Sequence, residues 1–184
     1  MKSLSGKLLI ASPHLSDPNF HQTVVLLAQH DEEGAMGLIL NRPGPVRLWQ
    51  LWDQITGHPC QHDDWVGDGG PVSTALIALH RNFQFADLMI ADNLFLASSK
   101  EHVEALVEGT SAEFRLYRGY SGWGAGQLED ELQVGGWLLG RLDTEQVFAA
   151  DTSNLWKTAV QSVGRTFWKA TLGIHEFPDD VSTN

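Results

Sequence analysis

Two apolar runs separated by a short acidic turn constrain the fold of this chain most strongly. The runs cover residues 23–28 (TVVLLA) and 35–40 (AMGLIL), and Asp31-Glu32-Glu33-Gly34 lies between them. A continuous apolar run of this length, bounded by turn residues, is typical of a buried strand. Because the connection is short, the sequence predicts that the two strands form an antiparallel hairpin.

The rest of the chain mixes short strands and short helices without a regular βαβ rhythm. Further strands are expected at residues 7–11, 72–80, 93–97, 112–117 and 137–142. Helices are expected at 46–55, after a cap-like segment at 98–101, at 127–132 and after a second cap-like segment at 152–154. Residues 58–70 and the Gly-rich residues 119–126 are expected to be loops. Strands that pair through hairpins favour an α+β fold over an α/β fold.

The length of 184 residues suits one domain. A single domain is expected over residues 1–184, with a core at about 6–175 and a polar tail at 176–184. No stretch approaches 18 consecutive apolar residues, and the first residues lack the apolar region of a signal peptide. The single cysteine, Cys60, fits a reducing compartment. We therefore expect a cytoplasmic protein.

The charge of the chain argues against two classes of partner. The net charge is −11, from 12 Lys and Arg residues against 23 Asp and Glu residues. A field of this sign repels nucleic-acid backbones and anionic membranes. The basic residues are scattered singly along the sequence, and no two are adjacent. Direct binding of nucleic acid or of a membrane is therefore not expected.

Two polar segments flank the predicted hairpin and are candidate binding sites. In the first, Asp17, Asn19 and His21 lie in one loop and can orient a water, a metal or a substrate. The favoured interpretation is that Asp17 and Asn19 hydrogen-bond their own backbone. In the second, Asn41 and Arg42 end a strand, where Arg42 can hold a carboxylate or a phosphate. A structural ion pair of Arg42 with an acid such as Asp17 is the favoured alternative.

A third candidate is the segment Gly67-Asp68-Gly69-Gly70-Pro71. Gly69 and Gly70 allow close approach of the backbone, so their N–H groups can cradle an anion. The segment lacks the lysine of a P-loop and the spacing of a dinucleotide-binding motif. A tight structural turn is therefore the default interpretation.

The fourth candidate is residues 119–129 (GYSGWGAGQLE), in which glycines alternate with aromatic and polar side chains. Tyr120, Trp123, Gln127 and Glu129 supply two rings, an amide and a carboxylate. The segment is either the rim of a pocket or a packed loop whose rings close the core. Both interpretations stay open at the level of sequence.

Eight histidines raise the question of a metal site. Only His58 and His62 lie close together, and Pro59 argues against a helix that would bring them onto one face. Together with Cys60 and Asp63 they are interpreted as solvated loop residues. No metal site and no cofactor are predicted.

Several segments stand together in a specific order and spacing. They are LLIASP (8–13), DPNF (17–20), TVVLL (23–27), GAMGLILNRP (34–43), GGPV (69–72), LH (79–80), GYSGW (119–123) and GQLE (126–129). This pattern, over roughly residues 6–175, resembles the YqgE/AlgH family of bacterial proteins. The sequence departs from the family at Gln22, where arginine is common, and from residue 167 onward.

The resemblance implies a fold and a general setting, but no particular activity. The implied fold is a cytosolic α+β domain whose bulged, coiled, partly barrel-like antiparallel sheet is flanked by helices. The AlgH name carries a label of transcriptional regulator. Because the sequence shows no helix-turn-helix and the charge is acidic, any regulation is expected to be indirect.

Three hypotheses about function follow. The favoured one is a non-catalytic binding or regulatory domain that uses the four candidate segments to hold a protein or a small molecule. The alternative is a hydrolase in which Asp17 or Glu129 acts as the base, Arg42 holds an anion and His21 or His80 transfers protons. A structural role in an oligomer would require a large apolar interface, for example around Trp49 and Trp52. Convergence of the candidate side chains on one pocket distinguishes the first two hypotheses.

Overall fold

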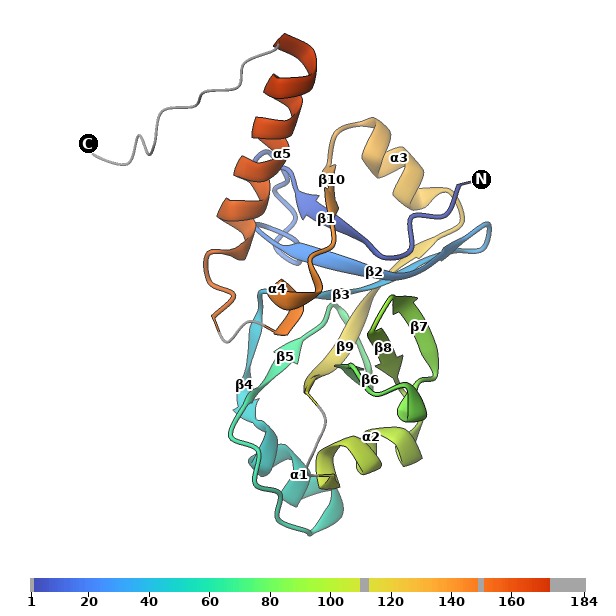
Figure 1. Cartoon of the computed structure of the whole chain (residues 1–184), viewed down its shortest axis with the longest axis vertical. Helices are drawn as coiled ribbons and strands as arrows, with labels where there is room; N and C mark the ends of the chain where they lie inside the picture. The colour runs from blue at the N-terminus through green and yellow to red at the C-terminus, as the bar shows by residue number, and fades with distance from the viewer. Residues whose placement is uncertain (1, 110–112, 149–150, 173–184) are drawn as a thin grey trace, which may run out of the picture.

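A strongly curled sheet forms the body of the protein (Figure 1). The computed structural model describes residues 2–109, 113–148 and 151–172. The strands are β1 Lys7–Ala11, β2 Val24–Asp31, β3 Gly34–Ile39, β4 Pro43–Arg47, β5 Trp65–Asp68, β6 Val72–His80, β7 Leu88–Ala91, β8 Leu94–Ala97, β9 Phe114–Gly124 and β10 Trp137–Arg141. The helices are α1 Leu48–Thr56, the short 3-10 helix η1 Phe83–Phe85, α2 Lys100–Glu108, α3 Gln127–Gln133, α4 Thr144–Phe148 and α5 Leu155–Leu172.

The hairpin predicted from the two apolar runs is the centre of the sheet. β2 and β3 pair antiparallel, with Leu26 opposite Leu38, and a bulge interrupts the register between Leu27 and Gln29. The main strand order is β10-β1-β2-β3-β9-β6-β8-β7, and β4 and β5 pair with each other beside β9. These neighbours are antiparallel except for β5 and β9, which run parallel. The predicted α+β fold with a bulged, coiled antiparallel sheet is confirmed.

The long strand β9 corrects the prediction of a loop at residues 119–126. The strand continues to Gly124, where its last residues pair with β3 and its first residues pair with β6. Gly119 adopts a φ of 74° inside the strand, which bends the backbone without ending the pairing. β9 thereby connects the upper and lower halves of the sheet in Figure 1. The glycines of this segment belong to a bent strand and not to a loop.

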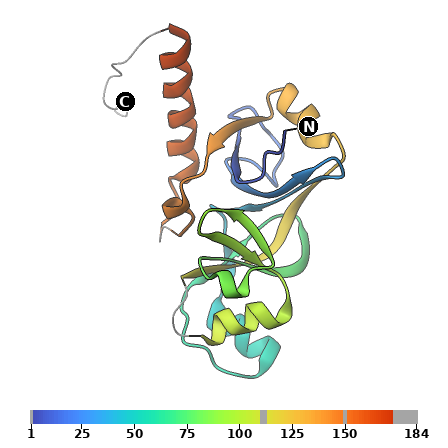
Figure 2. The same ribbon diagram turned by 45° about the vertical axis from the view of Figure 1, so that its right-hand side comes forward.

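The helices cover different parts of the sheet (Figure 2). α1 and α2 lie at one end, where Trp52 and Leu106 pack with Leu116 of β9. α5 lies along β1 and β10 at the other end, and the Trp156 indole N–H donates to the backbone carbonyl of Ala11 at 2.8 Å. Among the described residues, no helix is long and apolar enough to cross a membrane.

Several short elements were not predicted. β4 begins at Pro43, directly after Asn41 and Arg42, which were expected to end a strand, and β5 lies within the predicted loop at 58–70. β7 and the short helix α4 were also missed. Each has only four or five residues, so local sequence carries little periodicity and the pairing partner decides its conformation. The predicted polar tail at 176–184 lies outside the described residues.

The start of α2 is held by a residue that sequence analysis did not consider. Ser99 occupies the N-cap position, but its side chain does not cap the helix. Its hydroxyl donates to the Asp87 carboxylate, which also accepts the backbone N–H groups of Ser98 and Ser99 at 2.7 Å and a hydrogen bond from His102. Burial raises the pKa of Asp87, but the hydrogen bonds from Ser99 and Ser98 outweigh it and lower the pKa from 3.8 to about 2.

The Asp87→Asn variant is expected to lose about 2 kcal/mol of stability at neutral pH, because the folded state favours the ionised carboxylate by nearly two pKa units. The stabilisation is present above pH 3.8 and is lost as the pH falls toward about 2. Urea unfolding of both proteins at several pH values measures this difference. If the difference in unfolding free energy between the two proteins stayed constant down to the lowest pH, the stabilisation would not come from the charged Asp87 carboxylate.

Candidate functional site

A polar pocket of about 460 Å³ lies between the end of β3 and the start of α5. We call it the cationic pocket. It is lined by residues from two distant parts of the chain, namely His21, Gln22, Thr23, Asn41, Arg42, Ser153, Asn154, Trp156 and Lys157. Three of the predicted candidates, His21, Asn41 and Arg42, therefore line one pocket.

Asn41, which lies two residues after the end of β3, fixes the geometry of this pocket. Its side-chain oxygen accepts the Val24 N–H at 2.8 Å, and its amide donates to the backbone carbonyl of Gln22 at 2.9 Å. Gln22 itself has a φ of 54°, a left-handed conformation that is uncommon for a residue other than glycine. Asn41 thus ties the chain after β3 to the first residue of β2 and to Gln22 just before it, and Arg42 follows it directly.

The Arg42 guanidinium does not form the predicted ion pair with Asp17. Its Nη1 donates to the backbone carbonyl of Asn19 at 2.7 Å, so the Asp17–His21 loop orients the arginine through its main chain. The Asp17 carboxylate accepts the Asn19 N–H at 2.7 Å, which is the turn that the favoured interpretation predicted. His21 is exposed, with its Nδ1 3.4 Å from the carbonyl of Leu15. Because a guanidinium carries five N–H donors, Arg42 retains donors for a ligand.

The electrostatics of the cationic pocket differ from those of the whole chain. Arg42 and Lys157 line it and no carboxylate does, although the net charge of the protein is −11. The pocket also lies at the N-terminus of α5, whose first turn contains no acidic residue. The first N–H groups of a helix lack intrahelical acceptors and carry partial positive charge. Lys157 adds a full positive charge to this end, so the local field favours an anion.

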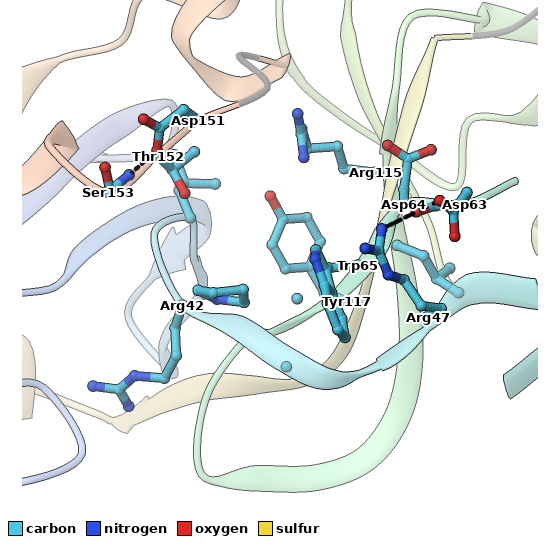
Figure 3. A pocket seen from close by; sticks show the side chains of 15 residues that line it. Arg42, Arg47, Asp63, Asp64, Trp65, Arg115, Tyr117, Asp151, Thr152 and Ser153 are labelled. Atoms are coloured by element: carbon cyan, nitrogen blue, oxygen red, sulfur yellow. Dashed lines mark hydrogen bonds and ion pairs between the residues drawn. The ribbon is translucent and has the colours of Figure 1, made fainter. Parts of the chain in front are cut away.

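A second cavity adjoins the cationic pocket, because Arg42 and Ser153 line both. This cavity, about 610 Å³ in volume, is called the aromatic cleft here after Trp65 and Tyr117 (Figure 3). The other side chains that give it its charge are Arg47, Asp63, Asp64, Arg115 and Asp151. In Figure 3 the Arg42 guanidinium points away from the centre of the cleft. Its stem therefore lines the aromatic cleft while its charge is directed away from it.

Two aromatic residues define the chemistry of the aromatic cleft. Trp65 is 48% exposed, and the Arg47 guanidinium lies 4.0 Å from the centre of its ring. Tyr117 is 2% exposed, and its hydroxyl forms no hydrogen bond with any residue that the structure describes. Figure 3 shows this hydroxyl directed toward the space between Thr152 and Arg115. Burial raises the pKa of Tyr117 to about 12, so the phenol is a neutral donor at physiological pH.

The carboxylates of the aromatic cleft are partly engaged. Asp63 lies 3.6 Å from Arg47 in an exposed ion pair. Asp151 accepts the Ser153 N–H at 2.8 Å, and this hydrogen bond lowers its pKa. The cleft therefore combines acceptors, a free phenol and an exposed indole face.

The predicted site residues Gly69 and Gly70 have a packing role. The Gly69 carbonyl accepts the N–H of Ile39 and the hydroxyl of Ser121, and the Gly69 N–H donates to the backbone carbonyl of Arg118. A methyl group on Gly70 would lie 2.3 Å from the Ser121 hydroxyl oxygen. These two glycines therefore bring the backbone against β9, which fits the default interpretation of a structural turn, and neither of them lines a cavity that contains Arg42.

The residues predicted at the start of α3 form a separate structural network. The buried indoles of Trp123 and Trp137 both donate to one oxygen of Glu131, at 2.9 and 2.7 Å. The Gln127 amide donates to the other oxygen of Glu131, and its carbonyl accepts the Gly124 N–H. This arrangement favours the packed interpretation of the segment. Tyr120, the other ring of this segment, packs against the main core.

Glu129 is paired with a histidine that sequence analysis did not single out. The backbone N–H of Leu4 donates to Nδ1 of the buried His30, so the other ring nitrogen carries the hydrogen. That nitrogen lies 2.8 Å from Glu129. Neither Glu129 nor Asp17 lines the cationic pocket or the aromatic cleft, so in these two cavities the proposed bases do not meet Arg42. His80, its proton carrier, is fully buried, and burial lowers its pKa.

No group of three or more His, Cys, Asp or Glu side chains suited to a metal ion occurs within residues 2–109, 113–148 and 151–172. In the segment considered for metal binding, His62 packs edge-on against the ring of Phe114, 4.9 Å between centroids. The half-buried Cys60 packs against the core below α1 and α2. These two residues thus contribute to packing and are only partly solvated.

The strongly curled antiparallel sheet and its flanking helices place this protein in the α+β class. Residues 8–168 match the family model described as AlgH-like, and the chain belongs to this family. A UPF0301 protein of Cupriavidus pinatubonensis is 38% identical over 170 residues, which cover 88% of this chain and 89% of that protein. A UPF0301 protein of Idiomarina loihiensis is 36% identical, with 92% and 96% covered.

A solved structure supports the same assignment. The solution structure of the AlgH protein from Pseudomonas aeruginosa matches with a TM-score of 0.73 and 33% identity, over 96% of this chain and 100% of that chain. The predicted family resemblance is therefore confirmed.

Sequence analysis missed the C-terminal half of the candidate site. Residues 152–154 were interpreted only as a helix cap, and Lys157 and Tyr117 were not considered. One signal was available, since a lysine in the first turn of a helix opposes the usual preference for acidic residues there.

Proposed function

We propose that this protein is a binding domain that holds a small anionic ligand in the cationic pocket. The observation that carries the proposal is the pairing of Arg42 and Lys157 in one pocket that no carboxylate lines, at the N-terminus of α5. Helix N-termini and arginine donors together favour carboxylate and phosphate groups. The pocket volume of about 460 Å³ falls within the range of small-molecule sites.

The hydrolase hypothesis has no comparable support. In the described part of the chain, the Asp17 carboxylate is used within its own turn and Glu129 is bonded to His30. The bases that this hypothesis names therefore do not share either of these two cavities with Arg42. The proposed domain binds its ligand without transforming it, and any regulatory effect would be transmitted to a further partner.

Titration calorimetry with inorganic phosphate and with citrate at low ionic strength tests the proposal. The Arg42→Gln and Lys157→Gln variants are each expected to bind at least about tenfold more weakly, because each loses a charge-assisted contact. Gln22→Arg is expected to strengthen binding, since it adds a cation to the lining of the pocket.

The matched control is Lys100→Gln, which removes the same charge from an exposed lysine on α2. It should leave binding unchanged. Equal weakening by Lys100→Gln and Lys157→Gln would show that only the net charge matters, and an absence of any measurable binding to the unaltered protein would refute the proposal.

A further inference from the structure

The aromatic cleft offers a place for the part of the ligand that is not anionic. We infer that the ligand of the combined site is a nucleoside monophosphate with an amino-bearing base. Its phosphate binds in the cationic pocket and its base in the aromatic cleft. This inference rests on the proposed function for the phosphate end and adds the chemical class of the rest of the molecule.

The adjacency of the two cavities is the first step. Arg42 and Ser153 line both of them, and the inferred ligand spans the two cavities past these residues. The charge of Arg42 is directed away from the cleft, while its stem forms part of the cleft wall (Figure 3). A ligand held by the guanidinium would therefore extend past this stem toward Tyr117.

The exposed indole of Trp65 is the second step. Arg47 lies over the ring at 4.0 Å, and yet the residue remains 48% exposed in a cleft wall. A flat, exposed aromatic face next to cations is the usual platform for stacking a base. A sugar phosphate without a base would leave this surface unused.

The unpartnered Tyr117 hydroxyl is the third step. The residue is almost completely buried, its phenol stays neutral, and the hydroxyl points into the cleft (Figure 3). The ring is held by its burial, while the hydroxyl faces the cleft without a protein partner among the described residues and is available to a ligand. A ring nitrogen or carbonyl of a base can accept this hydrogen bond.

The carboxylates of the aromatic cleft determine which end of the ligand lies there and how many phosphates the ligand carries. Asp64 and Asp151 can accept N–H groups from the exocyclic amine of a base, but they repel a phosphate. The phosphate therefore belongs at the Arg42 and Lys157 end. Additional phosphates, as in a triphosphate or an oligonucleotide, would have to approach these carboxylates and are expected to add no affinity.

Titration calorimetry tests the inference with inorganic phosphate, ribose 5-phosphate and adenosine monophosphate. The nucleotide is expected to bind roughly tenfold more tightly than the other two. In Trp65→Ala and Tyr117→Phe the nucleotide should bind no better than ribose 5-phosphate, while phosphate affinity stays the same. Arg42→Gln should weaken all three. Urea unfolding confirms that each variant keeps its fold.

The outcomes separate this inference from the proposed function. If phosphate binds with the expected dependence on Arg42 but the nucleotide gains nothing over ribose 5-phosphate, the anion site stands and the nucleotide class is wrong. If the nucleotide gains affinity that Trp65→Ala and Tyr117→Phe do not reduce, its base lies elsewhere and the inference fails. An oligonucleotide that binds more tightly than the monophosphate also overturns it. If none of the ligands binds, both proposals fail.

Discussion

Replacing Gly70 by alanine is expected to lower the free energy of unfolding by about 4 kcal/mol, from backbone strain and overpacking together. Gly70 has a φ of 148°, which side chains rarely allow. The added methyl would lie 2.3 Å from the Ser121 hydroxyl oxygen and 2.4 Å from the carbonyl carbon of Tyr120. Both residues belong to β9, whose pairing on either side leaves little room to shift. Urea unfolding measures the loss.

Gly126→Ala is the matched control for Gly70→Ala. Gly126 has a φ of 75°, but nothing lies within 4 Å of the position of an added methyl. In this variant only the unfavourable positive φ lowers the free energy of unfolding, by about 1 kcal/mol. If the two variants were equally stable, the close approach of Gly70 to β9 would not be important, and the binding interpretation of this segment would regain support.

The Glu131→Ala substitution is expected to lower the free energy of unfolding by about 3 kcal/mol, because it leaves two buried indole N–H groups without an acceptor. Trp123 and Trp137 are 5% and 3% exposed, so water cannot readily replace the carboxylate. The loss is measured by urea unfolding, with near-ultraviolet circular dichroism as a report on the packing of the indoles.

Glu131→Gln and Asp130→Ala are the controls for Glu131→Ala. Glutamine keeps an oxygen that both indoles can reach, so most of the stability should return. Asp130 is exposed on the same helix, and its replacement should change stability by less than about 1 kcal/mol. A loss in Asp130→Ala as large as that in Glu131→Ala would assign the effect to helix charge and not to the hydrogen bonds.

Local sequence predicted the parts of the fold that have their own periodicity. The β2–β3 hairpin, α1 with its left-handed Gly57 cap, β6 and the start of α3 all follow from apolar spacing and turn residues. β4, β5 and β7 did not follow, because a strand of four or five residues is stable only when a partner strand satisfies its backbone. The Gly-rich part of β9 was misassigned for a related reason. Its pairing with β3 and β6, and not its composition, keeps it extended.

The candidate site was predicted only in part. His21, Asn41 and Arg42 were found, since polar residues at a strand end next to a turn-rich loop are a local signal. Glu129 and Trp123 were included because they look exposed or accessible in sequence, whereas they are bonded to His30 and Glu131 in the structure. Lys157 could not be connected to Arg42, because nothing in the sequence places α5 beside the end of β3.

The sequence by itself determined the α+β class, the central hairpin, the family and the acidic charge, because these depend on composition and on spacings of a few residues. Only the tertiary structure decided which polar residues are free to bind a ligand. It uses Asp17, Glu129 and Glu131 to satisfy donors of the fold, and it brings Arg42 and Lys157, which are far apart in the sequence, to one pocket. The physical reason is that burial and hydrogen bonding between distant segments decide whether a polar group is already engaged.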